Sequence, residues 1–152
     1  MRVIEFRRSE PAELIGQMRQ LAESGRGWVN LVADVDDAPP PPSGLGALFG
    51  ASGPAVPFLT WTAPGRGRRG PTAASVGIQH ASGTKARIRL RDGGCAVPSE
   101  WRVRQDHPKR GLVAELPAEV DAKVALAWLF AASDVLTRVP LGDRWLAEIH
   151  DI

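Results

Sequence analysis

The chain has 152 residues, 43% of them hydrophobic, so its length matches one ordinary domain that can bury a sizeable core. The only cysteine, Cys95, excludes an internal disulfide and any multi-cysteine zinc site, and it agrees with a reducing cytoplasm. The longest apolar run, Val124–Ala132, has nine residues, far fewer than the roughly 18 that a membrane span needs. We therefore expect a single cytoplasmic domain over residues 1–152, without a signal peptide or membrane contact.

The net charge of +2 hides an uneven distribution of charges. Between Thr60 and Arg110 there are eleven Lys or Arg residues and three acids, which is +8, while the rest has eight and fourteen, which is −6. This asymmetry indicates an anionic partner. The competing interpretation is compositional, because abundant Arg, Ala, Gly and Pro are also what GC-rich codons produce.

The N-terminal part predicts a strand, a helix and a second strand. Residues 1–6 alternate as a short strand, and Ser9 is the expected N-cap of a helix that ends at Gly25. One stripe of this helix is apolar: Leu14, Met18 and Leu21. Residues 28–36 then alternate as a strand, with Val29, Leu31, Ala33 and Val35 on one face.

Residues 37–57 form a Pro/Gly-rich loop within the domain. The four consecutive prolines Pro39–Pro42 fit neither a helix nor a central strand. The loop is either a mobile flap over a site or a surface loop held to the core by Leu48 and Phe49, and we favour the second interpretation. A strand is expected at residues 58–62, followed by a basic loop at 65–70.

Four strands are expected between Ser75 and Pro117, at residues 75–80, 85–91, 100–105 and 112–116. Turns at 81–84, 92–94 and 106–111 separate them. A long apolar helix follows from Ala118 to Arg138. One of its faces is marked by Val120, Val124, Trp128, Ala131 and Val135, and that face is widened by Leu126, Leu129, Phe130 and Leu136. Residues 144–150 fit a strand and a helical turn equally well.

This order of elements predicts an α+β fold: a mainly antiparallel sheet with an N-terminal helix and the long apolar C-terminal helix packed on it. The order is also compatible with a helix-grip arrangement, in which a curved sheet wraps the last helix.

Strand alternation in the central region predicts a basic sheet face. Side chains of a strand alternate between two faces, so Ala86, Ile88 and Leu90 would point inward. The outward set would consist of Lys85, Arg87, Arg89, Arg91, Arg102 and Arg104. Arginine offers forked donors to phosphate, although a solvated or edge-protecting face would look the same. The face carries no aromatic residue for base stacking.

Candidate catalytic residues are few. His80 shares the inward face of Val76 and Ile78, where a hydrogen-bonded core histidine is the expected role. Asp106 and His107 share a basic turn and have the form of an acid/base pair, but an exposed Asx turn explains them better. Cys95 is a weaker candidate nucleophile, and the three histidines lack metal-ligand spacing. We expect no metal and no cofactor.

We therefore expect a non-catalytic binding domain whose basic face meets an anionic partner, either a nucleic acid or an acidic protein. The alternative is a small-molecule-binding protein or enzyme with a cavity between the sheet and the C-terminal helix, using His80 or His107 as acid/base. A subunit or immunity-type protein that docks a flat face on another protein is a third hypothesis.

Overall fold

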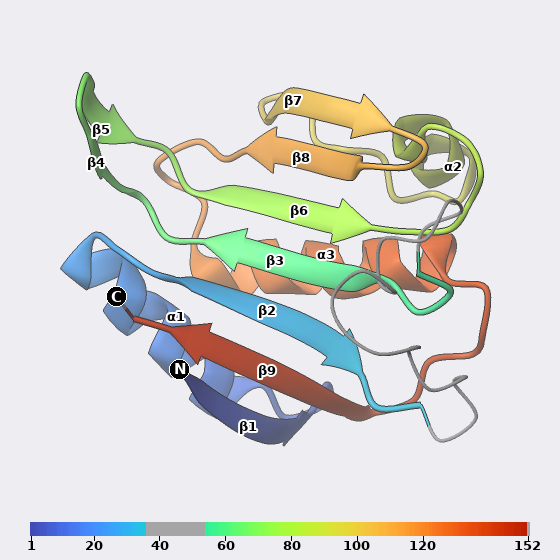
Figure 1. The fold of residues 1–152 in the computed structure, drawn as a ribbon, viewed down its shortest axis with the longest axis horizontal. Helices are drawn as coiled ribbons and strands as arrows, with labels where there is room; N and C mark the ends of the chain where they lie inside the picture. The colour runs from blue at the N-terminus through green and yellow to red at the C-terminus, as the bar shows by residue number, and fades with distance from the viewer. Residues whose placement is uncertain (36–53, 152) are drawn as a thin grey trace.

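The computed structural model describes residues 1–35 and 54–151. Its body is a seven-stranded antiparallel sheet with strand order β1-β9-β2-β3-β6-β8-β7 (Figure 1). These strands are β1 Arg2–Arg7, β2 Trp28–Ala33, β3 Phe58–Thr62, β6 Ser75–Gln79, β7 Arg102–His107, β8 Gly111–Glu115 and β9 Arg144–His150. A separate two-stranded hairpin, β4 Gly65–Gly67 and β5 Gly70–Thr72, extends from one corner of the sheet.

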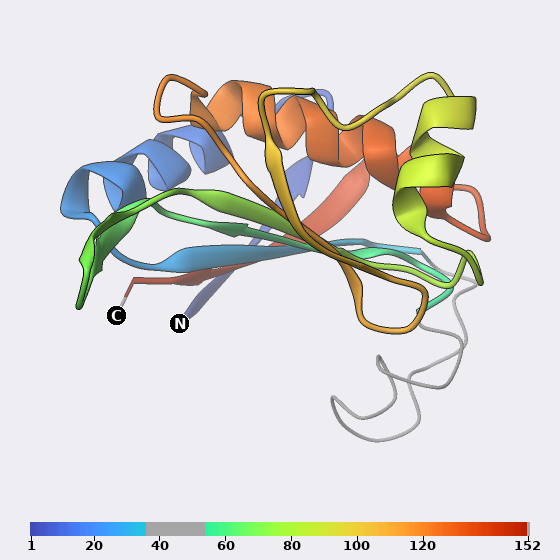
Figure 2. The same cartoon turned by 90° about the horizontal axis from the view of Figure 1, so that it is seen from above.

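Three helices lie on one face of the sheet: α1 Ala12–Ser24, α2 Ala86–Asp92 and α3 Ala122–Leu136 (Figure 2). In the described part of the chain no helix covers the opposite face. The core fills the space between the helices and the sheet. Its helical side includes Leu14, Met18, Leu126 and Leu129, and its strand side includes Val29, Leu31, Leu59, Ile78 and Leu112. The predicted α+β class with a mainly antiparallel sheet is confirmed.

Helix α1 confirms the predicted stripe, since its buried residues are Leu14, Ile15, Met18 and Leu21. Gly25 ends the helix with a left-handed φ of 72°, and its N–H donates to the carbonyls of Leu21 and Ala22. The predicted N-cap is wrong. Pro11 holds that position, and the Ser9 hydroxyl instead donates to Asp143 Oδ2 at 2.7 Å. Because Ser9 bonds Asp143, which lies 134 residues later in the sequence, its hydroxyl does not cap the helix.

Helix α3 is shorter than predicted because Asp121 caps it. The Asp121 carboxylate accepts a hydrogen bond from the backbone N–H of Lys123 at 3.0 Å. The predicted face was partly wrong, because Val124 is 55% exposed and Ala131 is exposed too. The residues that α3 buries are Ala122, Ala125, Leu126, Leu129, Phe130, Ala132, Ser133 and Leu136.

The predicted strand at 85–91 is wrong, because these residues form the α2 helix. In a helix, residues four apart share a face, so Ala86 and Leu90 are both fully buried while Ile88 between them is 49% exposed. The carboxylate of Asp106 accepts a hydrogen bond from the Ala86 N–H at 2.9 Å, and this bond holds the start of the helix. Gly93 ends α2, so the predicted hairpin at 92–94 is wrong as well.

The last strand decides an open alternative of the sequence. Residues 144–150 form β9, which pairs with both β1 and β2 and therefore lies inside the sheet. Trp145, Ala147 and Ile149 point toward the helices and are buried.

Three further predicted segments, at residues 65–70, 100–105 and 37–57, can be compared with the structure. The basic loop at 65–70 is an ordered hairpin whose turn is Arg68–Arg69. The strand expected at 100–105 occurs two residues later, as β7. Of the loop predicted at 37–57, only residues 54–57 belong to the described part, so the four prolines, Leu48 and Phe49 lie outside it.

No helix in the described ranges has the length and apolar character needed to cross a membrane.

Candidate interaction surface

The six cations predicted to share one sheet face do not share it. Lys85 immediately precedes α2, Arg87, Arg89 and Arg91 lie on that helix, and only Arg102 and Arg104 lie on a strand, β7. All six side chains are nevertheless exposed. The prediction of exposed cations was therefore right, whereas the sheet face that was to present them was wrong.

The elements that carry these cations lie along one long side of the molecule, which we call the basic side (Figure 1). It consists of the β4–β5 hairpin at one end, the edge strand β7, and α2 with the β7–β8 turn at the other end. These elements carry eleven cations, all of them exposed: Arg66, Arg68, Arg69, Lys85, Arg87, Arg89, Arg91, Arg102, Arg104, Lys109 and Arg110. Figure 2 views the molecule from this side.

Most of these cations form no ion pair with an acid in the described part of the chain. Arg104 Nε lies 3.2 Å from Glu115 Oε1, and Arg91 Nε lies 3.4 Å from Asp92 Oδ1. The other nine form no ion pair with any residue in the ranges that the structure describes. Elsewhere, by contrast, Arg8 binds Asp134 through two hydrogen bonds of 2.7 and 2.6 Å.

Aromatic side chains are not available for base stacking on the basic side. Trp101 precedes β7, but it is buried and packs edge to face against Trp128, with ring centroids 5.0 Å apart. Single-stranded nucleic acids are usually held by exposed aromatic rings. The basic side therefore offers charge and forked arginine donors without a stacking platform.

A groove of about 820 Å³ begins at the base of the β4–β5 hairpin. We call it the hairpin groove. Its walls are the β4–β5 hairpin with the residues after it, the end of α1, and the connection from β8 to α3. Its lining is mainly apolar, with Ala22, Pro64, Ala74, Leu116, Pro117 and Val120 among its residues. Sequence reasoning missed it, because scattered Ala and Pro residues of three connections form no periodic pattern.

An ion pair closes the helical rim of the hairpin groove. Two guanidinium nitrogens of Arg19 donate to the Asp121 carboxylate at 3.1 and 2.8 Å. The hydrogen bond from Arg19, followed by that from the Lys123 N–H, lowers the pKa of Asp121 to about 2. The two charges pair with each other at the rim of the groove.

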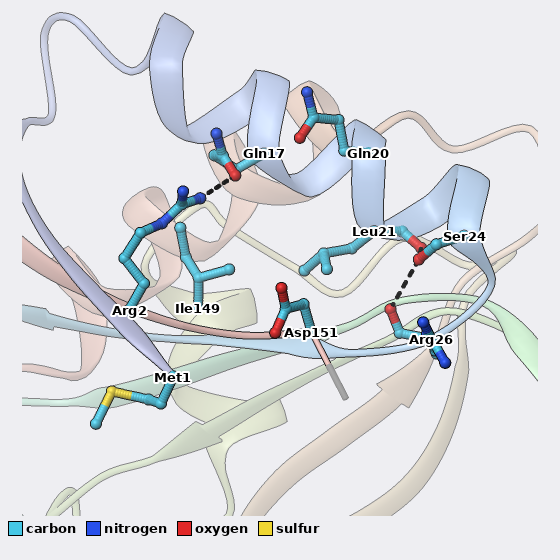
Figure 3. A pocket seen from close by; sticks show the side chains of 9 residues that line it. All are labelled: Met1, Arg2, Gln17, Gln20, Leu21, Ser24, Arg26, Ile149 and Asp151. Carbon is cyan, nitrogen blue, oxygen red and sulfur yellow. Dashed lines mark hydrogen bonds between the residues drawn. The ribbon is translucent and has the colours of Figure 1, made fainter.

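A second, more polar cleft of about 430 Å³ lies between α1 and the ends of β1 and β9 (Figure 3). Arg2 reaches across it and hydrogen-bonds Gln17 of α1, above Leu21 and Ile149. Asp151 adds a negative charge to the same cleft. The cleft contains charges of both signs, and its Arg2 is already hydrogen-bonded to Gln17. The cleft therefore has no clear preference for an anionic ligand.

His80 is buried, as predicted, with 1% of its surface exposed. Its Nδ1 lies 2.8 Å from the Ser82 hydroxyl, while its Nε2 is buried and has no hydrogen-bond partner. The carboxylate of Asp106 binds the Ala86 N–H. His80 therefore has Ser82 as a hydrogen-bond partner, whereas Asp106 bonds the backbone of Ala86, so the hydrogen-bonded relay of a hydrolase triad is not formed among these residues.

The other candidate residues also have structural partners. His107 ends β7, and its Nδ1 accepts hydrogen bonds from the N–H groups of Lys109 and Arg110 at 3.0 and 3.2 Å, so the imidazole stabilises its own turn. Neither His80 nor His107 lines the hairpin groove or the cleft of Figure 3. Burial, and to a lesser extent Asp134, raises the pKa of the Cys95 thiol, which disfavours a nucleophilic thiolate.

Within residues 1–35 and 54–151, no three His, Cys, Asp or Glu side chains gather closely enough to hold a metal ion.

His80 makes stability depend on pH. Burial lowers the pKa of its imidazole below 6.5, and the charge of Asp106 opposes this only in part. As the pH falls below 6.5, His80 binds a proton in the unfolded chain but not yet in the folded chain. The free energy of unfolding therefore decreases with falling pH until the pH is below the lower pKa of the folded state. One proton limits this loss to about 1.4 kcal/mol per pH unit.

We expect His80→Leu to remove this loss, so that the variant gains stability relative to the parent between pH 7 and 5, as measured by urea unfolding. Ser82→Ala keeps the imidazole and should retain the parent's pH dependence. Parallel pH profiles of His80→Leu and the parent would contradict the assignment.

Comparison with known proteins gives no guide to function: no family model matches the chain, and no curated protein or solved structure shows significant similarity to it.

Proposed function

We propose that this protein is a non-catalytic binding domain that uses its basic side against an anionic macromolecular partner, a nucleic acid or an acidic protein surface. The observation that carries the proposal is the set of eleven exposed cations on the elements of the basic side, nine of them without an ion pair among the described residues. Cations without an ion pair can offer their N–H donors directly to a partner's phosphates or carboxylates.

The exposed cations also indicate how the partner binds. The basic side runs from the β4–β5 hairpin to α2, the full length of the sheet (Figure 1). A partner with many negative charges can contact several arginines at once, and binding then weakens steeply with salt. A cytoplasmic location, expected from the lone Cys95, remains part of this proposal.

The test is a titration of duplex DNA, single-stranded RNA and poly-L-glutamate by fluorescence anisotropy over a range of salt concentrations. We expect at least one of these polyanions to bind at low salt. Replacing Arg87, Arg89 and Arg102 together by alanine should weaken that binding at least tenfold and flatten its salt dependence by about three counterions. These three arginines have no ion pair in the described part of the chain, so the fold should be unaffected.

The matched control removes three exposed cations from elsewhere, with Arg7, Arg26 and Lys123 replaced by alanine. The loss of charge is identical, so this variant should bind nearly as the parent does. Equal weakening by the two triple variants would show that only net charge matters and would reject the basic side as the contact surface. Absence of binding to all three polyanions would reject the proposal.

A small-molecule-binding protein is the second candidate. The observation in its favour is the hairpin groove, whose volume of about 820 Å³ lies within the range of ligand pockets. This groove lies beside the β4–β5 hairpin, whereas the sequence predicted a cavity between the sheet and the C-terminal helix. His80 and His107 take no part in it, so acid/base chemistry by either histidine gains no support from the groove. Its test is a thermal-shift screen in which Ala118→Trp, a substitution in the groove lining, should cancel genuine hits.

A further inference from the structure

The hairpin groove has two walls of different electrostatic character. One wall is the β4–β5 hairpin, where Arg66 lines the groove and Arg68 and Arg69 form the turn of the same hairpin. The other wall contains Glu23 at the end of α1 and Glu119 before α3. Between these walls the groove is mainly apolar, and the buried indole of Trp61 contributes to its lining.

The hairpin wall carries the positive charge that has no ion pair; of its three arginines, Arg66 lines the groove, and Arg68 and Arg69 lie in the hairpin turn beyond the lining. Arg66, Arg68 and Arg69 are exposed, and none forms an ion pair within the described ranges. On the opposite rim, Arg19 and Asp121 bind each other and present little net charge. Glu23 and Glu119 repel anions, so a negatively charged occupant is favoured only along the hairpin wall.

The base of the β4–β5 hairpin also packs closely against the end of α1. Its first residue, Gly65, approaches the C-terminal turn of α1 so closely that a Cβ would lie 2.6 Å from the Gly25 carbonyl oxygen. The antiparallel pairing from Gly65↔Thr72 to Gly67↔Gly70 then carries the arginines outward. A wall fixed at its base can hold a ligand against the groove without first having to be ordered.

We propose that the hairpin groove binds a segment of an acidic protein, with an apolar anchor side chain in the groove and carboxylates against Arg66, Arg68 and Arg69. This inference rests on the proposed function and narrows its partner to a protein. A nucleic acid has the required charge, but its unstacked bases are usually held by exposed aromatic rings, and the basic side does not present such rings. An acidic peptide with a hydrophobic residue supplies both features.

The experiment compares two acidic probes, poly-L-glutamate and a random copolymer of glutamate and tyrosine, in anisotropy titrations at equal carboxylate concentration. Burial of an aromatic side chain should make the copolymer bind about tenfold more tightly than poly-L-glutamate. Replacing Arg66, Arg68 and Arg69 by serine should weaken binding of both probes at least tenfold.

Two tryptophan variants separate the groove from the charge. Ala118 lines the groove and is exposed, so Ala118→Trp should fill the groove and abolish the copolymer's advantage while leaving poly-L-glutamate binding unchanged. Ala131 is equally exposed but lies on α3 outside the groove, so Ala131→Trp should leave both affinities unchanged. Thermal melting checks that each variant is folded.

Each outcome decides between the two proposals. If poly-L-glutamate binds and tyrosine adds nothing, the groove proposal is wrong while the basic side stands. If duplex DNA binds more tightly than either acidic polymer, and Ala118→Trp has no effect, the partner is a nucleic acid and the groove is not used. If no polyanion binds, both proposals fail together.

Discussion

Replacing Gly111 by alanine is expected to destabilise the protein by about 3 kcal/mol or more. Gly111 opens β8 with a φ of 85°, a left-handed value that side chains rarely adopt. A Cβ at this position would lie 2.2 Å from the carbonyl oxygen of Ile78 on β6. The obstacle is backbone in the neighbouring strand, so β6 and β8 would have to separate locally to make room.

The matched control for Gly111 is Gly94. Its φ of 78° is similar, but a Cβ there would meet nothing within 4 Å. Gly94→Ala therefore measures the backbone strain alone, about 1 kcal/mol. Urea unfolding of the two variants gives the comparison, and equal losses would show that β6 and β8 do not approach as closely as the structure has them.

Replacing Trp145 by alanine is expected to cost about 3–5 kcal/mol, because the indole lies at the centre of the core. Trp145 is 1% exposed on β9, and its ring meets Phe130 of α3 edge to face, with centroids 4.9 Å apart. Its Nε1–H donates to the Gly142 carbonyl at 3.1 Å. The substitution removes the contact between the last strand and the longest helix, and it leaves a large cavity.

Trp145→Phe tests this assignment more gently. A phenyl ring keeps the edge-to-face contact with Phe130 and loses the hydrogen bond, so the cost should fall to about 1–2 kcal/mol. Trp28, by comparison, is half-buried and stacks on His150 with centroids 4.6 Å apart. Chemical denaturation should show Trp28→Ala to be much milder than Trp145→Ala, and the reverse order would place β9 outside the core.

Most cations of the basic side form no ion pair in the described part of the chain, in contrast to several cations elsewhere. The protein carries nearly equal numbers of basic and acidic residues, nineteen and seventeen. Away from the basic side they often satisfy each other, as Arg8 does with Asp134 and Arg19 with Asp121. A surface of unpaired arginines is therefore a local property that the net charge of +2 conceals.

The sequence by itself predicted those elements whose local residue pattern fits one type of secondary structure. The apolar stripe and Gly25 predicted α1, because helix periodicity and a left-handed stop are local signals. Alternation predicted β2, whose Val29, Leu31 and Ala33 are buried. The same alternation placed His80 inside, and the charge count between Thr60 and Arg110 found the cations.

Only the tertiary structure decided elements whose local pattern fits two periods. The stretch at 85–91 alternates like a strand, yet it is a helix, since Asp106 holds its start and Leu90 packs in the core. Residues 144–150 form a strand because they pair with β1 on one side and with β2 on the other. The basic side and the hairpin groove likewise arise from segments distant in sequence. Contacts between such segments are set by packing, which no local window of sequence contains.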